Sequence, residues 1–354
     1  MKPPRDRLAD TGVPMENLRF PRISVVVPAY NRSELLESTL GSIFGQTIPV
    51  REVLLVDDGS TDGHKGVVEA LSQRHHDWKD RLRCLRQDNQ GKSVALNVGL
   101  QSATGDWIAF NDSDDRWLPE KLELQFKALS QHPEAGACFT DVRFVNNPEL
   151  LKTAFDDTQL NYRTTFGIEH DVPRLYGTYP GIYMQTVLVH AEVMRRLGGF
   201  DASIRVSMDT DFVFRLGLAT PMCYVNLPLV EVDRTDGRAI GLTTQHPMGS
   251  VERLEVHEYL ATKWLSLTEE SRPDLRRRLL NRRTSTQSEL ANKHLLRHEF
   301  ETARSVMGRA IGQNPKFGMV VKLLLAAVAP GLLQREIKRR DERSGQLARG
   351  PLVL

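Results

Sequence analysis

Cysteine is scarce in this 354-residue sequence, and its three cysteines, Cys84, Cys138 and Cys223, lie far apart without any C-x-x-C pair. The spacing therefore gives no sign of a zinc or thiol redox motif. Each cysteine lies in an apolar, strand-like run. We expect three small core residues in a protein of a reducing compartment.

Long apolar segments are also missing. Residues 1–7 contain no apolar stretch of the kind that a secretory signal needs. The longest uncharged apolar run, residues 323–333, is far shorter than the roughly 18 to 20 residues that cross a bilayer. These two observations predict a cytoplasmic protein. The net charge of +2 says little as a total, because basic residues are concentrated in the last third of the chain. We expect no nucleic-acid partner.

Two familiar nucleotide-binding signatures are absent. The segment from Gly59 to Gly66 does not form G-x-G-x-x-G. Arg86 stands where a P-loop ending in Gly91-Lys92-Ser93 would need its first glycine. A nucleotide, if one binds, must be held in another way.

The sequence does contain alternating strand and helix patterns after a Pro-rich, charged arm at residues 1–20. Apolar runs at 23–28, 53–56, 82–86 and 107–110 predict strands, and helical patterns lie between them. Asn31 and Glu34 resemble a capping box for the first of these helices. This order predicts a mostly parallel α/β sheet that binds its ligand at the carboxyl ends of the strands.

A cluster of acidic residues follows the fourth predicted strand, in the segment Asn111-Asp-Ser-Asp-Asp115. Asp112 and Asp114 alternate, so both point to one side of an extended chain, and a bend can turn Asp115 towards them. Oxygen ligands without His or Cys suit Mg²⁺ or Mn²⁺ that completes its shell with phosphate oxygens. The alternative is an ordinary acidic turn before a helix that opens near Pro119.

Five motifs in order resemble those of family 2 glycosyltransferases, which adopt the GT-A fold. They are V-P-A-Y-N at 27–31, V-D-D-G-S at 56–60, N-Q-G-K with A-L-N at 89–97, F-N-D-S-D-D at 110–115, and G-G-F-D at 198–201 followed by D-T-D at 209–211. The resemblance covers about residues 22–235. It implies an inverting, metal-assisted transferase that uses a nucleotide sugar. Met208, where the family usually has Glu, and Asn111, where it usually has an apolar residue, depart from the pattern.

The resemblance also implies roles for individual residues. Tyr30 would stack on the nucleotide base, and Asp57 or Asp58 would accept a hydrogen bond from it. Asp112 and Asp114 match the D-x-D pair that holds the divalent cation on the diphosphate. The full set of residues expected to bind the nucleotide sugar is Pro28, Tyr30, Asn31, Asp57, Asp58, Lys92, Asn97, Asp112 and Ser113.

An inverting displacement needs a general base on the face of the sugar opposite the diphosphate. Asp209 is the predicted base. Asp211, two residues further on, cannot share its helical face, and we expect it to cap a helix or to pair with Arg215. Asp201 is expected to be a turn residue.

Residues 141–182 carry few regular patterns and several aromatic residues, including Tyr162, Tyr176 and Tyr179. Because aromatic faces often bind sugars, this segment is either a wall that binds the acceptor or an irregular loop with core tyrosines.

The character of the chain changes to helices at about residue 247. Helical patterns at 251–267, 273–293 and 298–313 precede an apolar stripe at 319–333, which is followed by Arg335, Lys338, Arg339, Arg340 and Arg343. An apolar stripe with a basic flank suits an interfacial helix on an anionic membrane. The alternative is a helix that packs on the catalytic domain. The expected domains are a flexible arm at 1–20, a GT-A catalytic domain at 21–246 and a helical region at 247–354.

The sequence thus predicts an enzyme that moves a sugar from a UDP- or GDP-sugar to a glycan or lipid-linked acceptor in surface polysaccharide assembly. Two rivals are an inactive glycosyltransferase-like scaffold and a sugar nucleotidyltransferase. The nucleotidyltransferase is disfavoured because its Gly-rich, Arg-bearing loop after the first strand is missing.

Overall fold

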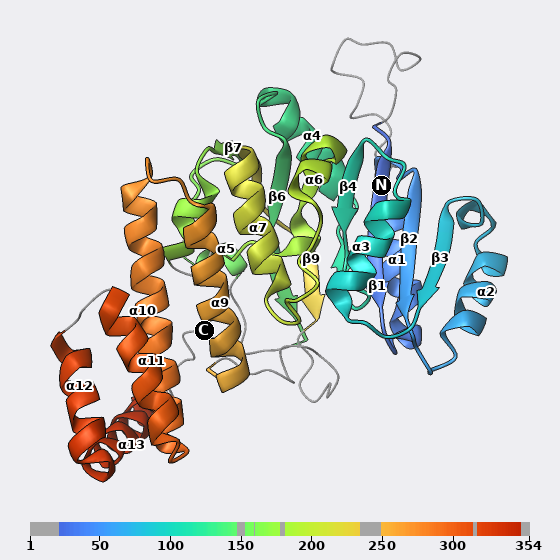
Figure 1. Ribbon diagram of the computed structural model, residues 1–354. Helices are drawn as coiled ribbons and strands as arrows, with labels where there is room; N and C mark the ends of the chain where they lie inside the picture. Colours follow the sequence, from blue (N-terminus) through green and yellow to red (C-terminus); the bar gives the residue numbers. More distant parts are fainter. Residues whose placement is uncertain are drawn as a thin grey trace.

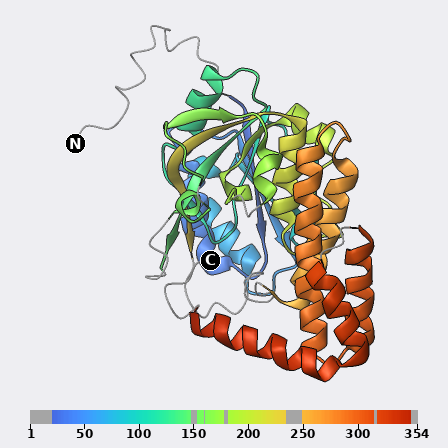
Figure 2. The same ribbon diagram turned by 90° about the vertical axis from the view of Figure 1, so that its left-hand side faces the viewer.

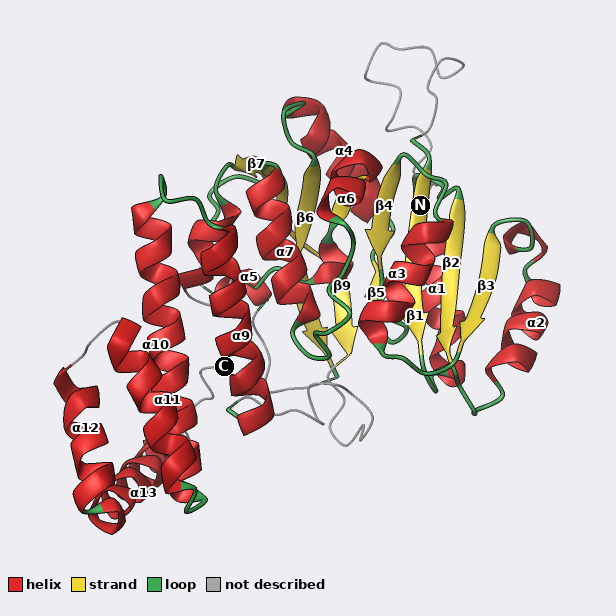
Figure 3. Ribbon diagram, viewed as in Figure 1, coloured by secondary structure: helices red, strands yellow, loops and turns green. Residues whose placement is uncertain are grey.

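The computed structural model describes residues 21–146, 153–158, 160–177, 181–233, 249–313 and 317–347. Within these ranges a mixed sheet is flanked by helices and followed by a group of helices (Figures 1 and 3). The predicted arm at 1–20 lies outside the described residues, as does Tyr179.

The sheet has nine strands among the described residues, in the order β3-β2-β1-β4-β8-β6-β9-β5, with β7 paired to β9. Their bounds are β1 Ile23–Ala29, β2 Glu52–Asp58, β3 Leu82–Gln87, β4 Trp107–Phe110, β5 Arg116–Trp117, β6 Ala137–Val145, β7 Phe166–Glu169, β8 Leu188–His190 and β9 Met222–Asp233. The first four strands are those predicted from the sequence.

The helices before residue 234 are α1 Leu36–Phe44, α2 His64–Arg74, α3 Lys92–Ser102, α4 Lys121–Gln131, α5 Ala154–Asp157, α6 Ala191–Leu197 and α7 Met208–Ala219. The later ones are α9 Val251–Leu267, α10 Pro273–Leu296, α11 Phe300–Gln313, α12 Phe317–Val328 and α13 Pro330–Leu347. A 3-10 segment, η5, spans Val172–Gly177.

The parallel half of the sheet brings the carboxyl ends of three strands together. Strand β1 is parallel to both β2 and β4, and it is buried along its whole length because helices cover both faces. Ala29 is aligned with Asp57, and Val26 with Phe110. The loops after β1, β2 and β4 therefore meet at one edge, as predicted. Strand β2 is also parallel to β3, and β6 is parallel to β9. The other pairings are antiparallel, so the sheet is more mixed than the sequence pattern indicates.

Alternate residues of β1 face two different apolar clusters. Val26 belongs to a cluster that includes residues of α3, α7, α9 and α10, whereas Val25 and Val27 belong to a cluster on the other face that includes residues of α1 and α4. Trp264 of α9 is fully buried in the first cluster and stacks on Phe214 of α7 at 4.5 Å between ring centroids. The first helices of the C-terminal region are thus part of the core beneath the sheet.

Two expectations about local structure are wrong, and for Tyr176 the structure decides between the two alternatives. Cys84 is exposed on the edge strand β3, whereas Cys138 and Cys223 are buried as predicted. Asn31 is not a helix cap, because the N-cap of the first turn is Arg32 without a side-chain hydrogen bond. Tyr176 is fully buried between Phe214 and Trp264, so at this position the core-tyrosine alternative holds.

The end of the chain folds into two helices rather than one. The predicted stripe at 319–333 is divided between α12 and α13, because Pro330 begins the second helix. Ala326, Leu333 and Ile337 are buried in a separate cluster with residues of α10 and α11. None of the helices in the described ranges has both the length and the apolar content that a membrane span requires.

Candidate active site

The acidic cluster lies in the loop after β4. One potential ligand oxygen from each of Asp112, Asp114 and Asp115 lies within 4.8 Å of the others. Asp115 is buried, and its Oδ2 accepts a hydrogen bond from Nε2 of Gln185 at 2.7 Å. Nδ2 of the buried Asn111 donates to the carbonyl of Asp115 at 3.1 Å and so fixes the loop. A close set of carboxylate oxygens fits a hard divalent cation such as Mg²⁺ or Mn²⁺.

Two cations face these carboxylates. Nζ of Lys92, the first residue of α3, lies 2.6 Å from Oδ1 of Asp112. Nε of Arg32 lies 3.6 Å from Oδ2 of Asp114. Burial and the neighbouring Asp112 carboxylate raise the pKa of Asp114, which shows how crowded the negative charge is. Sequence reasoning missed Arg32, although its place directly after Asn31 at the end of β1 was an available signal.

The residues predicted to hold the nucleotide base lie beside this cluster. Tyr30 is 41% exposed, so its ring is open to a ligand. Asn31 adopts φ 51°, and its Oδ1 accepts a hydrogen bond from the N–H of Thr61 at 2.8 Å, which ties the loops after β1 and β2 together. Pro28 is buried within β1, and Ser113 is buried in the acidic loop.

Asp57 and Asp58 are both engaged within the protein. Oδ1 of Asp57 accepts from the N–H of Ser60 at 2.8 Å, and its Oδ2 pairs with Arg86. Asp58 accepts from the backbone N–H groups of Gln90 and Gly91 at 2.8 and 2.9 Å. The two carboxylates therefore shape the loops around the site, and Asp57 stabilises the turn that follows β2.

The side chain of Asn97 forms hydrogen bonds with the backbone of Phe200. Its Nδ2 donates to the carbonyl of Phe200 at 2.8 Å, and its Oδ1 accepts from the N–H of the same residue at 2.8 Å. Gly199 is needed there, since it has φ +83° and an added Cβ would lie 2.5 Å from Oδ1 of Asn97. The contacts observed for Asn97 hold a turn before α7, and its role towards a nucleotide sugar stays a prediction.

Asp209 stands in the first turn of α7 and is partly exposed. Burial lowers the pKa of Lys92, but the carboxylates of Asp112, Asp209 and Asp114 outweigh it and raise that pKa overall. Asp209 is therefore close enough to act on the same ammonium group as the acidic cluster. The charge of Asp209 thus acts on the ammonium group that pairs with Asp112, across a sequence separation that no motif spacing fixes.

Asp211 faces the opposite way. Its buried carboxylate accepts from Nε of Arg215 at 2.8 Å, which confirms the predicted pairing, and from Nε1 of Trp264 at 3.1 Å. Asp201 accepts from the N–H of Ser203 at 3.0 Å, as a turn residue does. Sequence reasoning gave no sign of Lys263, whose Nζ lies 2.7 Å from Asp201 and 3.0 Å from Asp211.

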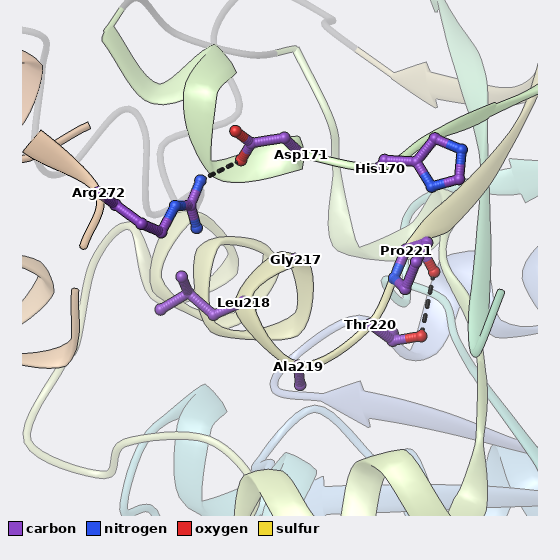
Figure 4. A pocket seen from close by; sticks show the side chains of 8 residues that line it. All are labelled: His170, Asp171, Gly217, Leu218, Ala219, Thr220, Pro221 and Arg272. Carbon is purple, nitrogen blue, oxygen red and sulfur yellow. Dashed lines mark hydrogen bonds and ion pairs between the residues drawn. The ribbon is translucent and has the colours of Figure 1, made fainter. Parts of the chain in front are cut away.

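A separate cavity of about 350 Å³ lies at the other end of α7 (Figure 4). There Arg272 pairs with Asp171 beside Gly217 and Thr220. None of the residues predicted to bind the nucleotide sugar or the metal, or to act as the base, lines this cavity, whereas His170 and Asp171 of the segment 141–182 do. We therefore assign the site from the clustered charges after β4 and not from the cavity.

The fold, with its acidic loop at the carboxyl edge of the sheet, defines a protein of the GT-A class. TarS of S. aureus, solved in complex with UDP-GlcNAc, superposes with a TM-score of 0.63 at 20% identity over 91% of this chain and 92% of that chain. The mannosyltransferase PcManGT from Pyrobaculum calidifontis, in complex with GDP-Man and Mn²⁺, gives a TM-score of 0.53 at 21% identity over 90% and 82% of the two chains. These likenesses establish the fold, including the helical C-terminal region.

The sequence comparisons show which proteins the chain resembles. Residues 24–181 match the family model described as Glycosyl transferase family 2. It is 36% identical over 153 residues to the putative teichuronic acid biosynthesis glycosyltransferase TuaG of Bacillus subtilis, covering 40% of this chain and 58% of that protein. It is 32% identical over 133 residues to the uncharacterized glycosyltransferase YibD of Escherichia coli, covering 37% and 38%. The chain thus spans less than two thirds of the length of these relatives.

Proposed function

We propose that this chain transfers a sugar from a UDP- or GDP-sugar to a glycan or lipid-linked acceptor, with inversion at the anomeric carbon. One observation carries the proposal. The carboxylates of Asp112 and Asp114 lie at the carboxyl edge of the sheet with Lys92 beside them, and Asp209 acts on the same ammonium group. This arrangement supplies the charges that a diphosphate leaving group and an acceptor hydroxyl need.

On the donor side, Asp112 and Asp114 would hold a divalent cation, Mn²⁺ or Mg²⁺. When bound, that cation compensates the charge that develops on the diphosphate as the glycosidic bond breaks. Lys92 and Arg32 lie at the same carboxylates and are placed to donate hydrogen bonds to phosphate oxygens. Tyr30 offers an open ring for the base to stack on. Complexes of related folds with UDP-GlcNAc and with GDP-Man support a nucleotide-sugar donor.

On the acceptor side, Asp209 would take the proton of the attacking hydroxyl. Its position in the first turn of α7 leaves its carboxylate partly exposed, whereas Asp211 is buried and paired. The similarity to TuaG, whose name refers to teichuronic acid biosynthesis, supports a role in surface polysaccharide assembly. We also propose a cytoplasmic location with docking on an anionic membrane, because α12 and α13 leave apolar side chains exposed next to cations.

The test is a screen of the purified protein for release of UDP or GDP from a panel of nucleotide sugars with Mn²⁺. The Asp209→Asn variant is measured beside the wild type. We expect turnover to fall by roughly 10² to 10⁴-fold in the variant, the usual effect of losing a general base, with unchanged nucleotide binding. Loss of nucleotide binding together with turnover would make Asp209 a binding or structural residue.

A further inference from the structure

We infer that Lys263 of α9 is a positioning residue that holds Asp209 in its catalytic orientation; this rests on the proposed role of Asp209 as the base. Lys263 joins two carboxylates on either side of the start of α7. Its Nζ lies 2.7 Å from Oδ2 of Asp201 and 3.0 Å from Oδ2 of Asp211. We call these three residues the Lys263 bridge.

The buried side of the bridge fixes the rotation of α7 about its axis. Asp211 is 0% exposed, and Lys263, Trp264 and Arg215 all donate to its carboxylate. Successive residues of an α-helix differ by about 100° in direction, so Asp209 points about 200° away from Asp211. Holding Asp211 against α9 therefore directs Asp209 to the other side of α7, towards Lys92 and the acidic cluster.

The outer side of the bridge holds the turn that leads into α7. Partial burial raises the pKa of Asp201, but hydrogen bonds from Lys263 and Ser203 hold it well below its usual range, so the carboxylate is ionised. Arg215 also binds this turn, because it donates hydrogen bonds to the carbonyls of Leu197 and Gly199. The turn and the first residues of α7 are thus held by two cations, Lys263 and Arg215.

A second contact from α9 reaches the residue next to α7. Ser207, the N-cap of α7, has φ 61°, a left-handed conformation that costs a non-glycine residue energy. Its Oγ lies 3.3 Å from Nε2 of His257 in α9. Burial, together with the charges of Arg282 and Arg253, lowers the pKa of His257 to about 4, so the ring is neutral at physiological pH. Helix α9 lies beside α7 in Figure 1. It contacts both ends of the turn that precedes Asp209, at Asp201 through Lys263 and at Ser207 through His257.

The experiment compares Lys263→Met and Lys263→Arg with Arg272→Met in the full chain. Arg272 provides the matched control, because its ion pair with Asp171 joins α10 to the catalytic domain at the far end of α7 (Figure 4). The readouts are kcat and KM for the nucleotide sugar that turns over fastest in the screen, UDP or GDP binding, and Tm.

We expect Lys263→Met to lower kcat by roughly 10 to 10²-fold with the donor KM and nucleotide binding unchanged, because a displaced base weakens the reaction step alone. Lys263→Arg should restore part of the rate. Arg272→Met should lower Tm while kcat stays within about two-fold of wild type. If Lys263→Met does not fold, Asp201→Asn removes only the outer charge pair and should show a smaller loss of kcat.

Two outcomes separate this inference from the proposed function. Wild-type kcat in a folded Lys263→Met variant, with Asp209→Asn inactive, would overturn the positioning role and leave the base in place. Wild-type kcat in Asp209→Asn would overturn the base itself. Equal losses of kcat in Lys263→Met and Arg272→Met would reduce the bridge to a general contribution to stability.

Discussion

At the scale of single residues, Lys121 is an unusual feature of the core. It is fully buried, with Nζ 3.0 Å from Oε1 of Gln125 and 4.0 Å from the centroid of the Trp117 ring. Burial lowers the pKa of Lys121 to about 7. Between pH 7 and about 10 the unfolded chain therefore binds a proton at this side chain that the folded chain has lost, and stability rises with pH.

We predict that Lys121→Met is more stable than wild type at pH 7 and that its advantage shrinks as the pH rises. The methionine removes the cost of burying an ammonium group while filling a similar volume. The difference in free energy of unfolding should fall by about 1 kcal/mol per pH unit from pH 7 to pH 9.5. Urea unfolding at both pH values measures it. A difference that does not change with pH would mean that Lys121 keeps the same proton in both states.

The residues of the site differ in how far the sequence could reveal them. Asp112 and Asp114 were predictable because they are neighbours in the chain and end a strand. Arg32, Gln185 and Lys263 were not, because their contacts join segments that are distant in sequence. The contacts of Asn97 show a further limit, since both polar atoms of this motif residue bond to the backbone of Phe200.

At the scale of elements, the end of the chain presents an apolar face bordered by cations. Leu324, Leu325, Val328 and Leu332 are 62%, 40%, 84% and 65% exposed. Arg335, Lys338 and Arg339 are exposed on α13, as is Glu336. In Figures 1 and 2, α13 lies towards the same edge of the molecule as the carboxyl ends of β1 and β2. Docking of this face on a membrane would bring the active-site edge near a lipid-linked acceptor.

We predict that the double variant Leu324→Glu/Val328→Glu no longer sediments with anionic phosphatidylserine vesicles at low salt. The net excess of cations near the surface contributes about 2 kcal/mol to docking, and the exposed apolar side chains contribute the rest. Leu267→Glu, at a residue 46% exposed at the end of α9, is the control and should sediment like wild type. Wild-type protein that stays in the supernatant, or a double variant that still sediments, would contradict the membrane proposal. A dimer lost in the variant would assign the face to a second copy of the chain.

The sequence pattern predicted an apolar stripe here but could not assign its buried half. Leu333 and Ile337 face α10 and α11, so only part of the stripe remains for a partner. Pro330 marked the break between the helices, although the pattern of apolar residues continues across it.

At the scale of the whole molecule, the packing bears on the proposed division at residue 246. Leu260, Trp264, Leu275 and Leu279 share one cluster with sheet residues, whereas α11 to α13 pack in a separate cluster with parts of α9 and α10. A boundary between structural units is visible in the sequence as a change of pattern. Which helices complete the core is decided by tertiary contacts that the pattern does not contain.

We predict that the chain ended at residue 246 fails to fold. The loss of α9 and α10 removes Trp264, Leu275 and Leu279 from the core cluster and exposes Tyr176 and Phe214, which pack on Trp264. The chain ended at residue 313 should keep cooperative unfolding and nucleotide-sugar cleavage. Circular dichroism during heating and the cleavage assay distinguish the two. A cooperatively folded 1–246 fragment would show that the catalytic domain is independent of α9.

The most direct test of the account is calorimetric titration of the protein with UDP and GDP, with and without Mn²⁺. We predict Mn²⁺-dependent binding of one nucleotide to the wild type and at least about ten-fold weaker binding to Asp114→Ala, with unfolding of the variant unchanged, since the diphosphate charge is then left uncompensated. Equal Mn²⁺-dependent binding by a folded Asp114→Ala variant would contradict the assignment of Asp112 and Asp114 as the ligands of the metal that holds the donor.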